Sequence, residues 1–593
     1  MRLAAAFLLL LGACGDRVER QTLQVELRVP ETGPCRPEGA PSDLVIEALG
    51  DFPASDERTI DVLRPGGPGV IDRFPTGTQV VTVRALGDRW TGFGAALLPE
   101  FEPSEHALTM LLLPPDESCP LPDPALADTG GAVVPTNDGS LVFVGGREGE
   151  VGSRRLIHWR TGEVTAEVID PGLQVRRSGV AAVRSGALVF ALGGALGDEG
   201  PAHDTFEVYD AAAGVMDEGL HTLLEPRRDA GALRLPNGSI LLVGGRATGN
   251  GEPLASAEVI DPNTRSATAT GELPTARALP FVRGLDDGSV LVVGGVGTGG
   301  GPLRELVAFD PRSGTFVALG VDLPSEAAAA VPLPGGRLLV VGVDGSLSSY
   351  RNAPPILGPV PGLVESAVDV TLPPLVDITA TALIDGRVLV SGMSALDDIR
   401  REFVVDIGSS SLTELPPPRA HGRLVTLSDG ATVALDDMGA AIRRVSERSP
   451  FGNPPASLLA EDLALDAPGR WRSEGASLVS EAADARADLA GLRFADVAIE
   501  LETAGSVEVL FQPDGAPATS VQVDDDEVGP TLCTLDGSGE VLLERRGESL
   551  RIVRGGEERT CRLDGLRDRV SLAVRARSGA RFDRIEVRRL EAE

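Results

Sequence analysis

Histidine and cysteine, which bind many protein metal ions, are few in this 593-residue chain, with five of each, and the histidines are widely separated. A metal site built on His203 and His221 would need supporting ligands that the spacing does not indicate, and no CxxC pair suggests zinc. We therefore expect no metal and no cofactor. The five histidines are His106, His158, His203, His221 and His421.

A glycine-rich stretch, Gly295–Gly300, has the GxGxxG spacing of a phosphate-binding loop. Such a loop must open a helix whose N-terminal amides face the anion, whereas here a strand pattern follows. We therefore expect a surface loop between two strands. The sequence also lacks GxSxG and HExxH signatures and contains no lysine, which removes lysine nucleophiles and P-loop lysines. The expectation is a protein that is not an enzyme.

Acidic runs such as Asp397-Asp398, Asp436-Asp437 and Asp524–Glu527 lack the alternating ligand spacing of a calcium loop, so we expect solvated turns. Arginines near glycine-rich segments are better candidates, because a guanidinium group makes bidentate contacts with carboxylates or backbone oxygens. The alternative is that they pair with local acids and only keep the surface soluble. The candidate binding residues are Arg147, Arg177, Arg228, Arg246, Arg277 and Arg304.

A repeat of about fifty residues must position these arginines. Each unit has a tight turn followed by an aliphatic run such as Leu141–Val144, which is typical of a strand buried on both faces. Such a unit cannot bury both faces of its sheet without neighbours, so seven units predict a closed β-propeller. The turns are Asp138-Gly139, Ser185-Gly186, Asn237-Gly238, Asp287-Gly288, Gly335-Gly336, Asp385-Gly386 and Asp429-Gly430.

The repeat resembles the kelch motif, which also builds the central domain of galactose oxidase. Glycine pairs end four of the aliphatic runs, and a third strand ends in an acidic turn, as in Phe206–Asp210. The resemblance implies a seven-bladed kelch-type propeller with four-stranded blades. Later units depart from it, and the tryptophan of the fourth strand is missing. The glycine pairs are Gly145-Gly146, Gly193-Gly194, Gly244-Gly245 and Gly294-Gly295, and the departures are Gly342-Val343, Gly392-Met393 and Ala434-Leu435.

The copper site of galactose oxidase requires tyrosines, histidines and a cysteine crosslinked to a tyrosine. This chain has only Tyr209 and Tyr350, and it has no cysteine between Cys119 and Cys533. We therefore do not expect oxidase chemistry from the resemblance.

Three domains are expected in all, because the chain is too long for a single core. Strand patterns in residues 21–120 resemble an immunoglobulin-like or transthyretin-like β-sandwich, and a proline-rich linker from Pro114 to Pro124 follows. The propeller is expected at 127–448. Residues 456–593 resemble a concanavalin-like or laminin-G-like jelly roll. The expected fold class is therefore all-β.

The N-terminus has the pattern of an export signal, with the apolar run Leu3–Leu11 followed by small residues. Leu11-Gly12-Ala13-Cys14 resembles the lipobox of bacterial lipoproteins, which implies cleavage of a signal peptide at 1–14, acylation of Cys14 and a tether at 15–20. The resemblance points to lipid anchoring at the outer membrane, with Gly15 after the cysteine. The alternative is an ordinary secretory signal with a chance cysteine.

The other four cysteines, Cys35, Cys119, Cys533 and Cys561, form an even set in an exported chain, which suggests disulfides. Three pairings are possible from sequence alone. Their grouping favours Cys35 with Cys119 and Cys533 with Cys561, each pair inside its own domain.

The formal net charge of −33 argues against a nucleic-acid partner, because the surface repels phosphates. We therefore expect a non-catalytic, lipid-anchored envelope protein whose propeller loops bind a protein or another envelope macromolecule. One alternative is a polysaccharide hydrolase or lyase with paired carboxylates in a propeller or jelly-roll pocket. The other is a structural spacer of the envelope.

Overall fold

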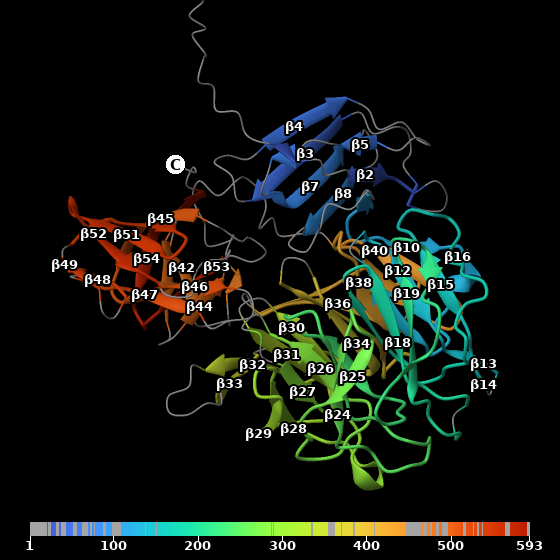
Figure 1. Ribbon diagram of the computed structural model, residues 1–593. Helices are drawn as coiled ribbons and strands as arrows, with labels where there is room; N and C mark the ends of the chain where they lie inside the picture. The colour runs from blue at the N-terminus through green and yellow to red at the C-terminus, as the bar shows by residue number, and fades with distance from the viewer. Residues whose placement is uncertain are drawn as a thin grey trace, which may run out of the picture.

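The computed structural model of the chain is all-β: apart from two single-turn 3-10 helices, η1 (Pro124–Leu126) and η2 (Thr298–Gly300), the described elements are strands (Figure 1). Residues 1–19, with the expected signal peptide and Cys14, lie outside the described residues. The structure describes 108–445 and 477–589 with short gaps, together with 20–21, 25–30, 35–36, 43–50, 56–61, 69–71, 74–75, 78–86, 91–97, 464–465 and 471–474.

Seven antiparallel sheets of one plan account for the repeat region, and we number them 1 to 7. The first four are sheet 1, with β11 (Ala132–Pro135), β12 (Leu141–Val144), β15 (Leu156–Trp159) and β16 (Glu167–Val168); sheet 2, with β17 (Ala181–Ser185), β18 (Leu188–Leu192), β19 (Thr205–Asp210) and β20 (Val215–Met216), where β21 (His221–Thr222) also pairs with β19; sheet 3, with β22 (Gly231–Arg234), β23 (Ile240–Val243), β24 (Ala257–Asp261) and β25 (Ser266–Ala269); and sheet 4, with β26 (Phe281–Gly284), β27 (Val290–Val293), β28 (Glu305–Asp310) and β29 (Thr315–Asp322).

The remaining three sheets follow the same order. They are sheet 5, with β30 (Ala327–Leu333), β31 (Arg337–Gly342), β32 (Leu347–Ala353) and β33 (Gly362–Ala367); sheet 6, with β34 (Leu375–Ala382), β35 (Val388–Ser394), β36 (Arg400–Asp406) and β37 (Ser411–Glu414); and sheet 7, with β38 (Arg423–Thr426), β39 (Thr432–Leu435), β40 (Ala440–Arg443) and β10 (Ser118–Leu121).

The second strand of each sheet is formed by the aliphatic run that the sequence predicts. In β12, β23 and β27 every residue is buried, because each strand has a neighbouring sheet on both faces. A glycine with φ of +86° at Gly139 and +87° at Gly238 allows the tight turn before these strands. The turn-plus-strand pattern thus has a direct physical basis.

Hydrophobic clusters join each of the seven sheets to the next one. Sheets 1 and 2 share one cluster and sheets 2 and 3 another, and the series continues until Val433 and Ile442 of sheet 7 pack with Phe143 of sheet 1. The first strands also contact in cyclic order, from β11 to β17 and onward to β38, which returns to β11. In Figure 1 the orange strands of sheet 7 accordingly lie beside the cyan strands of sheet 1.

Sheet 7 takes its fourth strand from the segment before the repeats. Within the stretch expected as a proline-rich linker, β10 pairs antiparallel with β40, with Cys119 opposite Ile442 and Pro120 opposite Ala441. Because β10 lies at the end of the sheet, the missing N–H group of Pro120 costs no ladder bond on the open side. This part of the chain is a strand, and the linker expectation is corrected there.

Two disulfides, Cys35–Cys119 and Cys533–Cys561, confirm the favoured pairing. The first does not stay within one domain as expected, since Cys119 belongs to β10 and hence to sheet 7. It therefore fastens the N-terminal segment to the repeat sheets. Disulfides of this kind indicate folding in an oxidising, exported compartment.

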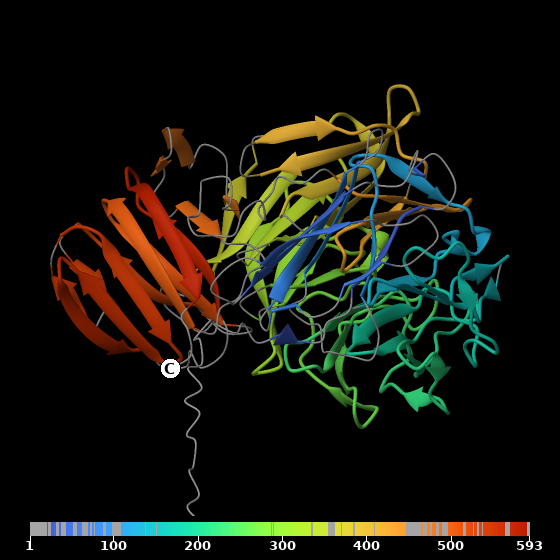
Figure 2. The same ribbon diagram turned by 90° about the horizontal axis from the view of Figure 1, so that it is seen from above.

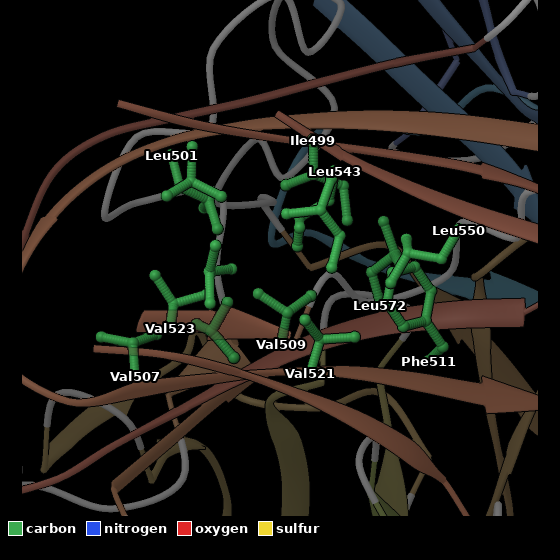
Figure 3. Close-up of a cluster of buried hydrophobic side chains, with 14 of the residues drawn as sticks. Ile499, Leu501, Val507, Val509, Phe511, Val521, Val523, Leu543, Leu550 and Leu572 are labelled. Carbon is green, nitrogen blue, oxygen red and sulfur yellow. The ribbon is translucent and has the colours of Figure 1, made fainter. Parts of the chain in front are cut away.

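The C-terminal region is a sandwich of two seven-stranded sheets over one hydrophobic core, with side chains from both layers interleaving (Figures 2 and 3). One sheet contains, in spatial order, β41 (Ala464–Leu465), β44 (Ala485–Asp488), β53 (Val570–Ala576), β46 (Val507–Pro513), β47 (Thr519–Val523), β48 (Glu527–Gly529) and β49 (Leu535–Asp536); the other contains β42 (Trp471–Glu474), β43 (Ser477–Ser480), β54 (Arg581–Arg589), β45 (Asp496–Ala504), β50 (Val541–Arg546), β51 (Ser549–Arg554) and β52 (Glu557–Arg562).

The N-terminal strands form three small sheets. Strand β2 pairs in parallel with β9 and antiparallel with β5, so this region is mixed. The sheets are β4 (Asp56–Asp61), β3 (Asp43–Gly50), β7 (Thr78–Leu86) and β8 (Thr91–Leu97); β5 (Gly69–Ile71), β2 (Val25–Arg28) and β9 (Leu108–Leu111); and β1 (Arg20–Gln21) with β6 (Phe74–Pro75). Within the described part of the chain, no helix has the length and apolar character needed to cross a membrane.

Candidate interaction face

Three arginines at intervals of fifty positions occupy equivalent places in sheets 2, 3 and 4. Arg177, Arg227 and Arg277 each precede the first strand of their sheet, and their side chains are fully buried. A buried guanidinium group requires a charged partner and several acceptors, since desolvation without them costs several kcal/mol.

Each of these arginines is paired with a glutamate from the third strand of the same sheet. Arg177 Nε lies 2.9 Å from Glu207 Oε1, and Arg227 Nη2 lies 2.6 Å from Glu258 Oε1. Arg277 forms the corresponding ion pair with Glu305. The three contacts show that the arginine and the acid belong to one repeated element of the fold.

The arginines also satisfy carbonyl groups of the glycine pairs. Arg227 Nη1 donates to Gly244 O at 2.7 Å and Arg277 Nη1 donates to Gly294 O at 3.1 Å, and Arg177 donates likewise to Gly193 O. These glycines have φ near +60°, which turns their carbonyls toward the guanidinium groups. The glycine pair and the buried arginine are therefore parts of one structural network.

The acids of this network are held by the backbone as well. Glu258 accepts hydrogen bonds from the amides of Leu224 and Glu225 at 2.8 and 3.2 Å. Glu207 accepts from the amides of Gln174 and Val175 in the same way. The ion pair thus fastens the segment that enters each sheet to the third strand of that sheet.

Three of the candidate binding residues are buried in the structure. Arg177 and Arg277 are inside the protein, and burial lowers the pKa of both guanidinium groups while Glu207 and Glu305 oppose the change. Arg228 is also buried and donates to Gly197 O at 2.8 Å. Their placement matches the alternative that they pair with local groups.

Sequence reasoning missed Arg227, although it is the counterpart of Arg177 and Arg277. The signal that identifies it is the interval of fifty positions, which singles out Arg227 rather than its neighbour Arg228. In the structure the two arginines also differ in their partners, since Arg227 pairs with Glu258 and Arg228 pairs with Asp229.

The other three candidates, Arg147, Arg246 and Arg304, lie in loops between the second and third strands of sheets 1, 3 and 4. Arg147 and Arg304 are exposed and Arg246 is half-buried. We call the end of the sheets formed by these loops and by the entries to the first strands the loop face. Short bridges such as Val151 with Gly197 and Pro201 with Thr248 tie neighbouring loops together there. The expected loop Gly295–Gly300 is part of this layer and contains η2, after which β28 follows.

The loop face changes character at sheets 6 and 7. The loops between second and third strands are short there, and Arg400 Nη1 of sheet 6 lies 2.9 Å from Asp436 Oδ2 of sheet 7. Leu396 and Met438 in these loops are 82% and 75% exposed, more than any other large hydrophobic side chain among the described residues. The acidic runs 397–398 and 436–437 belong to these turns, where Asp397 also pairs with Arg401 at 2.7 Å.

Contacts of Arg443 join sheet 7 to sheet 6 and to the segment before the repeats. Arg443 of β40 lies 2.9 Å from Glu402 of β36, and it donates to Asp116 O and Pro416 O at 2.7 Å each. The Glu402 Oε2 and Arg443 Nε atoms are close but not aligned as a hydrogen bond. Burial therefore raises the pKa of Glu402 to about 7, although Arg443 opposes the change.

A second buried pair attaches the N-terminal strands to sheet 7. Asp429, in the seventh predicted turn, accepts from Arg444 Nη2 at 2.8 Å and from the amide of Leu111 at 3.4 Å. Arg444 in turn donates to Leu111 O at 3.3 Å. Burial raises the pKa of Asp429, opposed by Arg444.

The described histidines take part in separate contacts. His158 Nδ1 lies 3.1 Å from the Tyr209 hydroxyl in the core between sheets 1 and 2, and burial raises the pKa of Tyr209 to about 12. His203 Nε2 lies 3.0 Å from Arg176 O, and His221 Nε2 lies 3.4 Å from Asp217. His106 and His421 lie outside the described residues. Among the described residues, no three His, Cys, Asp or Glu side chains are grouped to hold a metal ion.

No protein-family model matches the chain, and no curated protein matches it. Among solved structures, the chain is similar to the protein described as "Structure of YjhT", with 12% identity and a TM-score of 0.33 over 46% of this chain and 97% of that chain.

Proposed function

We propose that sheets 1 to 7 are the blades of a kelch-type β-propeller closed by β10. The support comes from the cyclic contacts of the first strands, from the seven inter-sheet clusters and from the glycine pairs bound by buried arginines. Strand β10 comes from the start of this region and pairs with β40 from its end. This strand pairing would close the ring. An electron density map of the intact protein tests the proposal by showing seven blades or another number.

We also propose the identity of the flanking domains. The two face-to-face C-terminal sheets fit a concanavalin-like or laminin-G-like jelly roll, and the N-terminal strands fit an immunoglobulin-like or transthyretin-like sandwich. Among the described residues of both regions, no three His, Cys, Asp or Glu side chains are grouped to hold a metal ion.

We infer further that the protein is lipid-anchored through Cys14 at the outer membrane, which agrees with an oxidising, exported environment. Acylation adds about 0.8 kcal/mol of membrane affinity for each buried methylene group. Labelling cells with a radioactive fatty acid tests this anchor: wild type takes up label and Cys14→Ala does not. Equal absence of label from both would contradict it.

The function that the geometry supports best is non-catalytic binding of a macromolecule at the loop face. One observation carries this proposal: buried charges are used in repeated structural ion pairs, whereas exposed arginines and exposed apolar side chains gather on the loops of one face. Loops held by a rigid scaffold are well suited to recognition.

A binding assay with the soluble three-domain protein tests this function. Envelope proteins from the native cell, fractionated and immobilised, are probed with wild type and with the charge-reversed variant R147E/R246E/R304E. The proposal predicts that the affinity of the variant for at least one fraction differs several-fold from that of wild type. The matched control is R160E, because Arg160 is an exposed arginine at the end of β15 away from the loop face. Equal binding by all three proteins would remove the loop face from consideration.

A further inference from the structure

Four exposed aliphatic side chains gather where sheets 6 and 7 meet on the loop face. Val376, Leu396, Ile399 and Met438 are 47%, 82%, 50% and 75% exposed, and we call them the apolar loop patch. Val376 lies in β34, the first strand of sheet 6, Leu396 and Ile399 lie between its second and third strands, and Met438 lies in the matching loop of sheet 7.

Strand pairing and one ion pair link the segments that carry these four side chains. Val376 pairs with Met393 across the sheet, and Met393 pairs with Arg400 on the next strand. Paired residues of adjacent strands point to the same face, so Val376 and Arg400 share one side of sheet 6. Arg400 then reaches Asp436 of sheet 7, two residues before Met438. The ion pair therefore ties the third strand of sheet 6 to the loop of sheet 7 that carries Met438.

The loops that carry the patch are held in defined positions. The amide of Ala395 donates to Pro374 O at 3.0 Å, and the amide of Asp398 donates to Ser394 O at 3.0 Å. Asp436 caps its own turn, accepting from the amides of Met438 and Gly439 at 2.9 Å each. Anchored loops lose little entropy on binding, which favours recognition by a pre-formed surface.

Leaving these side chains in water forgoes the favourable free energy that burying them supplies. Contiguous exposed apolar patches with a polar rim mark interaction sites in soluble proteins. Among the described residues, the other large aliphatic side chains exposed on the loop face, Val151, Leu196, Leu279 and Val343, are each less exposed than Leu396 and Met438. The patch thus calls for an occupant.

The charge around the patch indicates what the occupant carries. Residues 374–377, 395–401 and 436–439 contain five carboxylates and two arginines, a formal net charge of −3. Both arginines are already paired, Arg400 with Asp436 and Arg401 with Asp397 and Glu414. An acidic rim of this kind repels anionic lipid and nucleic acid and attracts a basic chain.

We propose that the apolar loop patch docks a segment of a second protein that combines aliphatic side chains with arginine or lysine. This inference rests on the proposed function of the loop face and specifies its partner. Aliphatic side chains of the segment cover Leu396 and Met438, and its cations lie against Asp398 and Asp437, which are exposed beside them.

The test measures fluorescence anisotropy of three labelled synthetic peptides with the intact soluble protein. One peptide contains leucine and arginine, one leucine and glutamate, and one glycine and arginine. We expect wild type to bind the leucine–arginine peptide best. The variant L396S/M438S should bind it at least tenfold more weakly, which corresponds to about 1.4 kcal/mol. D398N/D437N should weaken binding and reduce its dependence on salt.

The matched control is L196S, because Leu196 is 53% exposed on the loop face of sheet 2, away from the patch. It should leave binding unchanged. Circular dichroism melts of all variants check folding. Equal affinity of wild type and L396S/M438S, or no binding of the leucine–arginine peptide to wild type, would overturn the proposal. So would stronger binding of wild type to phosphatidylglycerol vesicles than to any peptide.

Including R147E/R246E/R304E distinguishes a failure of the patch proposal from a failure of the proposed function of the loop face. If that variant loses the peptide and L396S/M438S keeps it, the loop face binds but the patch is the wrong site. If every variant binds as wild type does, binding at the loop face itself is contradicted.

Discussion

Sheets 2 to 4 and sheets 6 and 7 share one strand order but are stabilised by different contacts. In sheets 2 to 4 each unit carries its own buried arginine, glutamate and glycine carbonyl. Sheets 6 and 7 instead use Arg443, which reaches Glu402 and Asp116, and Arg444, which holds Leu111. A unit that obtains support from outside the repeat can lose the repeat's sequence pattern.

The loops of the two groups of sheets also differ in what they do. The glycine-rich loops of the regular units are bridged into a layer, and the regular spacing of their glycine pairs reflects the buried arginine network. The irregular units have short loops that expose Leu396 and Met438. The part of the chain with the weakest repeat pattern is thus the part with the strongest indication of a partner.

The largest expected effect comes from the disulfide that supports sheet 7. Cys35 and Cys119 are 84 positions apart, and closing a loop of that length is worth about 4.5 kcal/mol in the chain-entropy account. We expect C35S/C119S to lower the free energy of unfolding of the repeat sheets by this amount, and so to lower their urea midpoint. Tryptophan fluorescence measures the transition, because Trp159 lies in the same core cluster as the two cysteines.

The control for this variant is C533S/C561S, whose 28-position loop is worth about 3.5 kcal/mol. Its effect should be confined to the C-terminal sandwich, which hydrogen exchange resolves by region. Loss of protection in sheets 2 to 4 before sheets 6 and 7 in C35S/C119S would contradict the difference that we draw between the two regions.

The next effect breaks the network of the regular units. Arg227→Met leaves Glu258 buried without its cation, which we expect to cost about 3–4 kcal/mol. Urea denaturation followed by circular dichroism measures the loss. Arg304→Met is the control, because Arg304 is exposed in a loop and should change stability by less than about 0.5 kcal/mol. Equal effects of the two substitutions would mean that the buried pair is not what holds sheet 3.

A pH experiment sharpens the contrast at sheets 6 and 7. The pKa of Glu402 in the folded protein is about 7, above the ordinary value of 4.5. Between these two pH values the folded state therefore binds more protons than the unfolded state. Its contribution to stability is therefore greatest at low pH and declines as pH rises from about 4.5 to about 7. We expect wild type to lose about 2 kcal/mol between pH 5 and pH 8 through this group.

Glu402→Gln removes that titration while keeping the shape of the side chain. The difference in unfolding free energy between wild type and variant should therefore vary with pH over this range. Denaturation curves at several pH values measure it, with Glu414→Gln as the control at an exposed carboxylate of the same sheet. A constant difference across the range would show that Glu402 titrates near its ordinary value.

The smallest effect on stability is expected at the apolar loop patch. L396S/M438S should change the unfolding free energy by less than about 0.5 kcal/mol, because both side chains are exposed. Thermal melts check this directly. A large loss of stability would mean that the two residues support the fold, and a reduced affinity of the variant would then need another explanation.

Much of the repeat architecture could be predicted from the sequence. The aliphatic runs at Ile240–Val243 and Val290–Val293 coincide with β23 and β27, because a strand buried on both faces has an unmistakable composition. The strand at β10 could not be predicted, since its prolines suggest a linker and its partner β40 lies more than three hundred positions away.

The candidate site was less accessible to sequence reasoning. An arginine that precedes a strand looks the same whether it faces solvent or a buried glutamate, so Arg177 and Arg277 were placed among binding residues and Arg227 was overlooked. The exposure of Leu396 and Met438 depends on how two turns meet in space, and the sequence carries no pattern for that.

Hydrogen–deuterium exchange of the intact soluble protein, with and without the leucine–arginine peptide, tests most directly whether recognition belongs to the irregular units. The account predicts protection in residues 395–401 and 436–440, with little change in the loops 147–155 and 246–255. Protection confined to the loops of sheets 1 to 4, with residues 395–401 and 436–440 unchanged, would contradict it.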